Sequence, residues 1–383
     1  MRLLTIYFVA YSVITLLFIW YKYMMKFITK KISYGLYETS YSVVIPVFNE
    51  KPALFRKCLK SVFKADGKKE IFVVDDGSKP ENRTAYKQIS KEFKVKYIQL
   101  AANEGKRAAQ YRAFKLVKNE IIVTIDSDTL INKNSLIELS KPFNDENVGA
   151  TTGNVRVYNR NKNLLTRIID ARYYNAFEFE RASQSAFGIV SCCSGVISAY
   201  RKTIIKEVMD RYLNQQFLGK TCTYGDDRHL TSLILRNHKV VFTKNAMAYT
   251  EAPESLYVLI KQQIRWKCSF IRENILALQY VFKRSKILAF ETIYESTIPL
   301  FSLLVRLSVI FYLIKLPLLI IYYSASILFM ALIRNLEALF KKEFKLVVYN
   351  SCYGFLQMFV IYWLYFVALY KLFIVSETKW LTR

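Results

Sequence analysis

An uncharged apolar run at residues 3–21 is the feature that most constrains how this chain can fold. About 20 consecutive apolar residues are enough for a helix to cross the hydrocarbon core of a bilayer. No small-residue cleavage site follows the run, so we expect residues 1–26 to form a retained membrane anchor and not a signal peptide. Basic residues cluster directly after it, which by the positive-inside rule places the following chain in the cytoplasm; they are Lys22, Lys26, Lys30 and Lys31.

The composition combines a strong positive charge with high hydrophobicity. The 383 residues include 56 Lys and Arg against 30 Asp and Glu, a net charge of +26, yet 53% of the residues are hydrophobic. This apolar fraction excludes a disordered basic tail and argues against a soluble nucleic-acid-binding protein. We therefore expect a multi-pass protein of the plasma membrane whose cationic surface faces the cytoplasm and anionic lipid, without a nucleic-acid partner.

Residues 40–250 have the pattern of a cytosolic α/β domain. Short apolar runs at 41–50, 70–78 and 120–128 each end in Asp, Asn, Gly or Ser, as buried strands do. Helical stretches separate them, which predicts βαβ units and a mixed, mostly parallel sheet; they lie around 52–64, 81–93, 105–118 and 133–142. Ligands of such sheets bind beyond the carboxyl ends of the strands.

The chain returns to membrane-like sequence after an interfacial helical region at 251–285. Within the C-terminal region 286–383, we predict spans at 296–314 and 316–333, joined by a turn at Lys315-Leu316-Pro317. A basic linker follows, and then a long apolar stretch at 347–373. A full crossing by that stretch would place the C-terminus outside.

Asp126-Ser127-Asp128 follows an apolar strand and is a candidate metal site. Residues i and i+2 of a strand share a face, so Asp126 and Asp128 can converge on Mg²⁺ or Mn²⁺ held jointly by substrate phosphates. The alternative is an Asx turn that closes the strand. Six cysteines without C-x-x-C spacing and only two histidines argue against zinc.

Asp76 and Lys106 are candidate nucleotide contacts. Asp76 ends a strand and can accept hydrogen bonds from a base or ribose, although Asp-Gly also forms simple turns. Lys106 opens a helix whose N-terminus favours anions such as a diphosphate. A solvated basic first turn is the alternative for Lys106.

Two further motifs point to an acceptor. In Gly225-Asp226-Asp227-Arg228, a carboxylate at a helix start is either a cap or a general base. Gln262, Arg265 and Trp266 share one face of a helix, where the indole can stack a sugar beside a phosphate. The alternative for Trp266 is an interfacial anchor of an amphipathic helix.

In this order, V-V-D-D-G-S, D-S-D, G-D-D-R and Q-Q-I-R-W resemble the motifs of processive family 2 glycosyltransferases, and most of all the streptococcal type of hyaluronan synthase. The resemblance covers roughly residues 40–280, extends to Trp380-Leu381-Thr382-Arg383, and implies a GT-A-like domain. Supporting segments are IPVFNE at 45–50, GKRAAQ at 105–110, the stretch at 163–185, and FLGKTCTYGDDRHLT at 217–231.

The resemblance implies a role for each motif. Asp76 would contact uridine, Asp128 with Asp126 would hold the metal on the UDP-sugar, and Asp227 would deprotonate the acceptor. The diphosphate would be bound by Lys106, Gln262 and Arg265, with Asp126 also beside the nucleotide sugar. The acceptor would meet Cys193, Ser194, Gly195, Asp226 and Trp266.

The implied reaction is inverting transfer that makes hyaluronan from UDP-GlcNAc and UDP-GlcA and extrudes it. Arg306, within a predicted span, is costly if it faces lipid, so it is a candidate for lining the exit path. Helix pairing could also satisfy it. Three features depart from the family: Val196 replaces a proline, Leu381 replaces a glycine, and one span precedes the domain instead of two. The family's terminal motif is cytosolic, which favours a tilted or re-entrant segment at 347–373.

Three alternatives stay open. A chitin-type or other capsular polysaccharide synthase shares the D-x-D and Q-x-x-R-W motifs but uses UDP-GlcNAc alone in the chitin case. A haloacid-dehalogenase-like phosphatase matches IIVTIDSDT formally, but that motif normally opens its domain. In the third alternative, a non-enzymatic membrane channel or scaffold, these residues would have no catalytic role.

Overall fold

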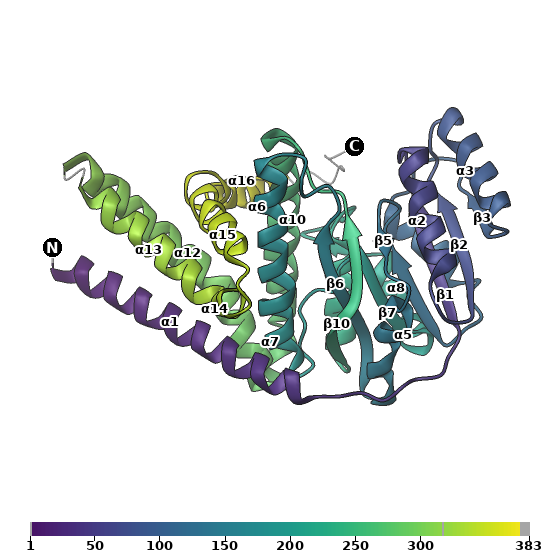
Figure 1. Cartoon of the computed structure of the whole chain (residues 1–383), viewed down its shortest axis with the longest axis horizontal. Helices are drawn as coiled ribbons and strands as arrows, with labels where there is room; N and C mark the ends of the chain where they lie inside the picture. The colour runs from purple at the N-terminus through teal and green to yellow at the C-terminus, as the bar shows by residue number, and fades with distance from the viewer. Residues whose placement is uncertain (1, 316–317, 376–383) are drawn as a thin grey trace.

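The computed structural model describes residues 2–315 and 318–375 and has two parts (Figure 1). An α/β domain contains the sheet, and helices α1 (Arg2–Lys31), α12 (Lys286–Lys315) and α13 (Leu319–Arg334) extend away from it. Helices α6 (Leu164–Tyr174) and α10 (Leu256–Ala277) lie between these two parts.

Among the described residues, the α/β domain has one large, mixed sheet. Its strands, in order across the sheet, are β3 (Lys96–Gln99), β2 (Lys69–Asp75), β1 (Tyr41–Val47), β4 (Ile121–Ile125), β7 (Ile197–Arg201), β6 (Val148–Val157), β10 (Lys239–Thr250) and β5 (Leu130–Ile131). Strands β3, β2, β1 and β4 are parallel, β7 runs against both of its neighbours, and β10 is parallel to β6. The predicted fold class, mixed and mostly parallel, is confirmed.

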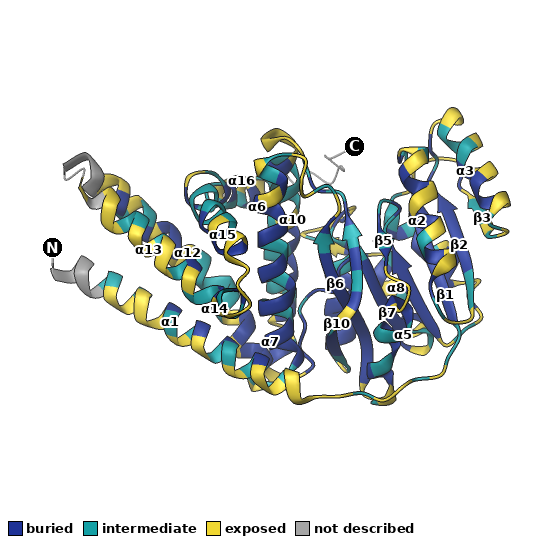
Figure 2. Ribbon diagram, in the orientation of Figure 1, coloured by how far each residue is buried: buried dark blue, intermediate teal, exposed yellow. Residues whose placement is uncertain are grey.

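Helices cover the sheet, which explains why its central strands are apolar throughout. Every residue of β1 and of β4 is buried, and the strands form a continuous dark layer in Figure 2. Parallel strands that are covered on both faces need side chains suited to burial at every position. The remaining elements of the domain are α2 (Pro52–Lys64), α3 (Pro80–Glu92), α4 (Lys106–Phe114), α5 (Ser135–Ser140), η1 (Lys141–Asn144), α8 (Lys202–Leu213), β8 (Gln216–Phe217), β9 (Lys220–Thr221) and α9 (Asp226–Leu235).

Three helices in the described part of the chain are long and apolar enough to cross a membrane, at Tyr7–Lys31, Lys286–Phe311 and Phe344–Ile361. The apolar helix Ile320–Arg334 is shorter. Helix α12 therefore begins well before the span predicted at 296–314. Exposed residues line the outer faces of α1 and α12 in Figure 2, and many of them are large and apolar, as expected for contact with lipid.

The helices between the two parts are partly irregular. Helix α6 continues into the π-helical segment η2 (Asn175–Arg181) and then α7 (Ala182–Ser185), while α10 is followed by α11 (Val281–Arg284). A buried ion pair at 2.5 Å joins Lys22 of α1 to Glu291 of α12. The short helix α14 (Leu336–Phe340) lies beside the end of α1, where Glu337 pairs with Lys30 at 3.1 Å.

The apolar stretch at 347–373 is not one continuous helix. Helix α15 (Phe344–Leu356) and η3 (Gln357–Ile361) are separated by a turn from α16 (Leu364–Tyr370) and η4 (Lys371–Val375). Helix α16 packs on α10, with Cys268 Sγ 3.6 Å from the Ala368 carbonyl oxygen, and the Phe373 ring lies 6.2 Å from that of Phe217 in the α/β domain.

The whole stretch therefore does not form one continuous spanning helix, because its second half finds apolar partners on α10 and returns to the α/β domain. Residues 316–317 of the predicted turn and the terminal Trp380-Leu381-Thr382-Arg383 lie outside the described residues.

Candidate active site

A single cavity of about 1880 Å³ runs from the carboxyl edge of the sheet to the membrane helices. At one end its wall includes Asp76 and Lys106, and at the other Arg306 of α12. Trp266 of α10 lines it as well. The predicted site residues thus gather on one cavity, with the exception of Cys193.

Asp76, directly after β2, organises the start of α4. Its carboxylate accepts hydrogen bonds from the backbone N–H groups of Glu104 at 2.8 Å and Gly105 at 3.0 Å. Gly105 has a φ of +93°, a conformation that favours glycine, and α4 begins at the next residue. Burial raises the pKa of Asp76 to about 6, although both N–H groups act against the rise.

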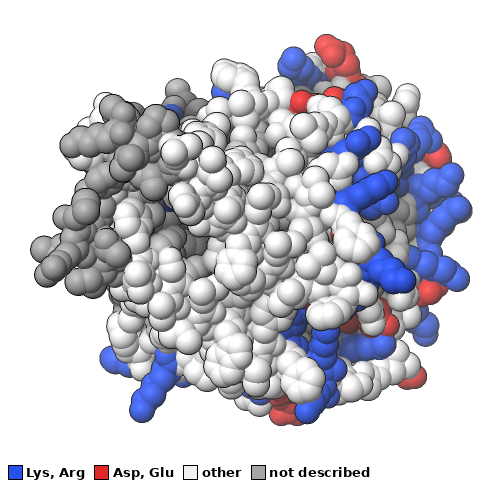
Figure 3. Space-filling view, turned by 60° about the vertical axis from the view of Figure 1, so that its left-hand side comes forward, with Lys and Arg blue, Asp and Glu red and all other residues white. Residues whose placement is uncertain are grey.

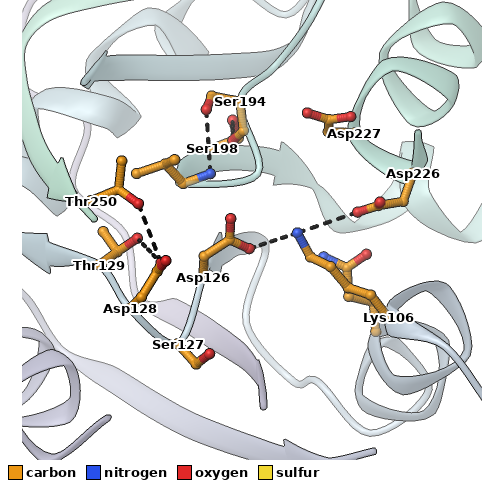
Figure 4. Close-up of polar contacts among 12 residues, drawn as sticks. Lys106, Asp126, Ser127, Asp128, Thr129, Ser194, Ser198, Asp226, Asp227 and Thr250 are labelled. Carbon is orange, nitrogen blue, oxygen red and sulfur yellow. Dashed lines mark hydrogen bonds and ion pairs between the residues drawn. The ribbon is translucent and has the colours of Figure 1, made fainter. Parts of the chain in front are cut away.

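Lys106 is the cation at the centre of the site (Figure 4). Its ammonium lies 2.6 Å from Asp126 Oδ1 and 3.3 Å from Asp226 Oδ2, so one lysine bridges two motifs that are distant in sequence. Burial opposes the charge, but these carboxylates outweigh burial and raise the pKa of Lys106.

Asp126 and Asp128 lie in the turn after β4, which ends at Ile125. The predicted shared strand face is therefore wrong, because neither residue belongs to the strand. Asp126 holds Lys106, whereas Asp128 Oδ1 accepts from the Thr250 hydroxyl at 3.3 Å, and the two carboxylates have different partners (Figure 4). Both line the cavity.

Asp226 and Asp227 open α9 after Gly225, which has a φ of +79°. Asp226 is buried and Asp227 is half-buried, and their surroundings shift their pKa values in opposite directions. Although burial acts the other way, Lys106 and Arg107 lower the pKa of Asp226. Burial, followed by the charge of Asp226, raises the pKa of Asp227. Such a divergence within a carboxylate pair is typical of groups with separate acid and base tasks.

Asp227 stands apart from Lys106 in Figure 4. Its Oδ1 accepts from the Arg228 backbone N–H at 2.8 Å, and the Cys192 thiol lies 3.7 Å from its Oδ2. Cys192, which the sequence motifs did not indicate, lines the cavity, whereas Cys193 is fully buried in the core. The predicted acceptor contact of the Cys193 side chain is therefore wrong, because that side chain packs in the core while those of Cys192 and Ser194 line the cavity.

Ser194 and Gly195 do reach the cavity. A Cβ atom at Gly195 would come within 2.8 Å of Lys106 Nζ, so the absence of a side chain lets the lysine approach the backbone. The Val196 backbone N–H donates to Ser194 Oγ at 3.3 Å. Proline has no backbone N–H group, so the proline that the family has at this position could not donate this hydrogen bond, whereas Val196 does.

Gln262, Arg265 and Trp266 project from α10 and line the cavity, as their shared helix face predicted. The Gln262 Oε1 atom is buried and has no hydrogen-bond partner in the described structure. Trp266 is 40% exposed, which leaves an aromatic face available for stacking. A polar ligand in the cavity can satisfy Gln262.

Beyond Trp266, cations lie on tyrosine rings. Lys267 Nζ is 3.8 Å from the Tyr365 ring centre, and the Arg306 guanidinium is 3.4 Å from that of Tyr362. Arg306 also donates to the Ser302 carbonyl oxygen at 2.8 Å. We call Lys267, Arg306, Tyr362 and Tyr365 the cation–aromatic lining, since all four line the cavity.

Charge is crowded in this lining. Burial, with added repulsion from Arg172 and Arg306, lowers the pKa of Lys267 to about 7. Sequence reasoning found Arg306 but missed the other three residues. The spacing of Tyr362 and Tyr365, three apart in a helical stretch, was the available signal.

Comparisons with known proteins agree with this architecture. The model of the family "Glycosyl transferase family 2" matches residues 42–209. A mannosyltransferase of Pyrobaculum calidifontis, solved with GDP-Man and Mn²⁺, shares the fold with a TM-score of 0.71 at 17% identity, covering 98% of this chain and 99% of the other. The fold and the site thus define a membrane glycosyltransferase of family 2 with a GT-A-like domain.

Curated relatives narrow the class. The hyaluronan synthase of Streptococcus pyogenes serotype M3 (strain ATCC BAA-595 / MGAS315) is 35% identical, covering 97% of this chain and 90% of its own. An N-acetylglucosaminyltransferase of Neorhizobium galegae is 36% identical over 68% of this chain and 61% of its own. The chain belongs to the hyaluronan synthase family, of the streptococcal type. The phosphatase and scaffold alternatives do not account for this membership.

Proposed function

We propose that this protein is a processive, inverting glycosyltransferase that makes hyaluronan from UDP-GlcNAc and UDP-GlcA and extrudes the polymer. The observation that carries the proposal is the continuity of the cavity. One space joins the carboxylates and Lys106 at the sheet edge to the cation–aromatic lining. A growing polymer can therefore stay attached to the site of transfer while its older end moves toward the membrane helices.

The donor nucleotide binds at the sheet edge. Asp76 lies beyond the end of β2, where nucleotides bind in open α/β sheets, and contacts the uridine. Lys106, Gln262 and Arg265 bind the diphosphate, since two are cations and the third presents a buried polar atom without a partner.

Asp128 and Asp126 are the residues that would hold a divalent cation, Mg²⁺ or Mn²⁺. The described residues contain no cluster of three or more His, Cys, Asp or Glu side chains that could form a complete metal site. Two carboxylates that share a metal with substrate phosphates suit Mg²⁺, which prefers oxygen ligands and retains water. The Lys106 ammonium, 2.6 Å from Asp126 Oδ1, is itself a cation beside this carboxylate, which supports the assignment. When bound, the metal supplies Lewis-acid stabilisation of the diphosphate.

Asp227 is the general base. It removes the proton from the acceptor hydroxyl, whose oxygen attacks the anomeric carbon of the donor sugar from the face opposite UDP. The bond between that carbon and the diphosphate oxygen breaks, and UDP leaves with the electron pair. Lys106 and Arg265 stabilise the charge that develops on the diphosphate.

The acceptor sugar lies against Trp266, with Ser194, Gly195 and Asp226 beside it. An indole face next to polar groups is a common surface for a sugar ring. Asp226, paired with Lys106 at 3.3 Å, links the acceptor side of the site to the donor side.

The cation–aromatic lining favours an acidic product over a chitin-type one. Glucuronate places a carboxylate on every second sugar, and Arg306 and Lys267 can pair with it while the tyrosine rings contact the sugar faces. A neutral polymer would leave these charges without partners. Arg306 is thus assigned to the path of the polymer.

We place the α/β domain on the cytoplasmic side of the plasma membrane, with α1, α12 and α13 as spans. Seen from the side of these helices, the surface is largely uncharged, and Lys and Arg gather where it meets the α/β domain (Figure 3). Basic residues at that level favour the cytoplasmic leaflet and its anionic lipids.

Incubation of membranes with each UDP-sugar singly and with both together tests the proposal. We expect polymer only with both donors, and complete digestion of that polymer by hyaluronidase. Polymer from UDP-GlcNAc alone would contradict the hyaluronan assignment and support the chitin-type alternative. No sugar transfer under any of these conditions would contradict the enzymatic assignment itself.

A further inference from the structure

Glu273 of α10 is a buried carboxylate that the proposed mechanism does not use. It is 3% exposed and is not one of the residues that line the cavity. Three side chains contact it: Gln215 Nε2 at 2.5 Å, Arg272 Nε at 2.9 Å and His229 Nδ1 at 3.0 Å. A buried carboxylate with this many partners is costly to assemble, so its location calls for an explanation.

The partners of Glu273 connect the elements that form the site. His229 belongs to α9, two residues after Asp227, while Arg272 of α10 donates through Nη2 to the Tyr224 carbonyl oxygen at 2.7 Å. Gln215 accepts at 2.8 Å from Arg107, the neighbour of Lys106 in α4. Glu273 thus joins the helix of the donor lysine to the helix of the base.

The contact between α10 and the turn before Asp227 is close. A Cβ atom at Gly225 would lie 2.5 Å from Ser269 Cβ and 2.8 Å from Arg272 Nη2. Arg107 also donates to the Cys222 carbonyl oxygen at 3.1 Å, so the loop is held from α4 as well. The backbone that ends in Gly225-Asp226-Asp227 is fixed between two helices.

His229 completes the charge balance. Its Nδ1 faces Glu273 and its Nε2 lies 3.3 Å from the Arg211 carbonyl oxygen. Both neighbours are hydrogen-bond acceptors, so an imidazolium satisfies both, whereas a neutral ring can donate to only one. Arg272 and His229 together hold Glu273 in its charged form, and despite burial the pKa of Glu273 is lowered to about 2.

We propose that Glu273 is a positioning residue that fixes the start of α9, and with it the Asp227 carboxylate, relative to Lys106 on α4 and Trp266 on α10. The proposal rests on the role of Asp227 as base. Glu273, His229 and Arg272 do not line the cavity, so they act through the Tyr224–Asp227 segment and not on the substrate. Since the three helices carry the base, the donor contact and the acceptor platform, the network sets the geometry of transfer.

The test compares steady-state kinetics of the full-length enzyme in membranes. Glu273→Gln keeps the shape of the side chain but leaves Arg272 and His229 without their counter-charge. We expect kcat for polymer synthesis to fall about 100-fold, as a displacement of about 1 Å at a reacting group can cause. The KM values for both UDP-sugars should change by less than about twofold, because the donor contacts stay in place.

Two further variants keep the test decisive. Adding His229→Asn to Glu273→Gln changes a second residue of the same network, so we expect the double variant to lose no more kcat than Glu273→Gln alone. Gln215→Leu cuts the link to Arg107 without a buried charge change, and should lower kcat about tenfold with unchanged KM, so that the proposal remains testable even if Glu273→Gln fails to fold.

Asp170→Asn is the matched control. Asp170 is also a buried carboxylate in an ion pair, 2.6 Å from Arg156, but it is remote from the loop before Asp227. It should reduce the amount of folded enzyme, measured by thermal unfolding and UDP binding, without lowering kcat per folded molecule.

The possible outcomes distinguish the positioning role of Glu273 from the proposed role of Asp227 as base. Wild-type kcat in Glu273→Gln or in Gln215→Leu would overturn the positioning role, as would an equal loss in Asp170→Asn. Additive losses in the double variant would overturn it too, because they would indicate general destabilisation. Normal polymer synthesis by Asp227→Asn would instead overturn the proposed base, whatever the result at Glu273.

Discussion

The two ends of the cavity differ in sign and in construction. At the sheet edge, carboxylates at the carboxyl ends of strands and at the start of α9 surround a single lysine. At the membrane end, Lys267 and Arg306 rest on tyrosine rings from a broken helix. The carboxylates of the acidic end can bind a metal with its nucleotide and can accept a proton from the acceptor sugar. The cations of the other end can bind an acidic product. One cavity can therefore perform transfer at one end and guide the polymer at the other.

The largest expected effect lies at the acidic end. Asp227→Asn removes the proton acceptor, and polymer synthesis should fall by about 100-fold to 10,000-fold, the range in which general base catalysis contributes. UDP-sugar binding should survive, because the role proposed for Asp227 is on the acceptor and not on the donor. Radiolabelled sugar incorporation and UDP binding to the same membranes measure the two effects.

The raised pKa of Asp227 also sets a pH dependence. The base works only when it is deprotonated, so kcat should fall as the pH drops through the raised pKa, above the ordinary aspartate value of about 3.9. Two results would contradict the assignment of Asp227 as the base. One is an acid limb of the kcat–pH profile centred below about pH 4, and the other is normal polymer output by Asp227→Asn.

An intermediate effect is expected at the cationic end. Arg306→Gln takes the charge from Tyr362 and from the path of the polymer, and should shorten the product about threefold to tenfold, as the loss of a desolvated cation–π contact allows. Sugar incorporation should fall less than chain length. Size-exclusion chromatography of the product measures the change.

Lys31→Gln serves as control for that variant. Lys31 also lies over an aromatic ring, that of Phe27 at 4.5 Å, but outside the cavity. Product of the wild-type length is expected from it. Equal shortening by both variants would mean that surface charge, and not the cation–aromatic lining, controls chain length.

The smallest effect is expected at the mouth of the acidic end. Lys51 is 74% exposed and pairs with Glu251 at 3.5 Å. Because exposed ion pairs contribute little, Lys51→Ala should change kcat/KM for either UDP-sugar by less than about twofold. A larger change in the same kinetic assay would show that the acidic end extends to the cavity mouth.

The acidic end was largely predictable, because its residues follow apolar strands whose order along the chain sets their order in space. Asp76 was found in this way, whereas Lys106 and Asp227 were found from their places at helix starts and from the family motifs, and all three line the cavity. The expected shared strand face of Asp126 and Asp128 was wrong, since β4 ends at Ile125 and side chains in a turn do not alternate. Cys193 was misplaced for a related reason, as local irregularity decides which neighbour faces the cavity.

The cationic end and the Glu273 network could not be read from the chain in the same way. Tyr365 and Lys267 come from helices about a hundred residues apart, and the apolar stretch that carries Tyr365 has the composition of an ordinary span. Glu273 lies in α10 beyond the Q-Q-I-R-W motif, and its partners Gln215 and His229 come from two other segments. No local pattern reports such contacts.

The amino-acid order alone predicted the division into membrane helices and an α/β domain and the strand-end carboxylates, because hydrophobic periodicity and polar strand ends are local properties. It indicated the family through the resemblance of its motifs. The three-dimensional structure was needed to see that the last apolar segment returns to α10, that Lys106 bridges two motifs, and that the pKa values of Asp226 and Asp227 shift in opposite directions. These depend on burial and on charges brought together from distant parts of the chain, and the electrostatic energy of a site is set by distance in space.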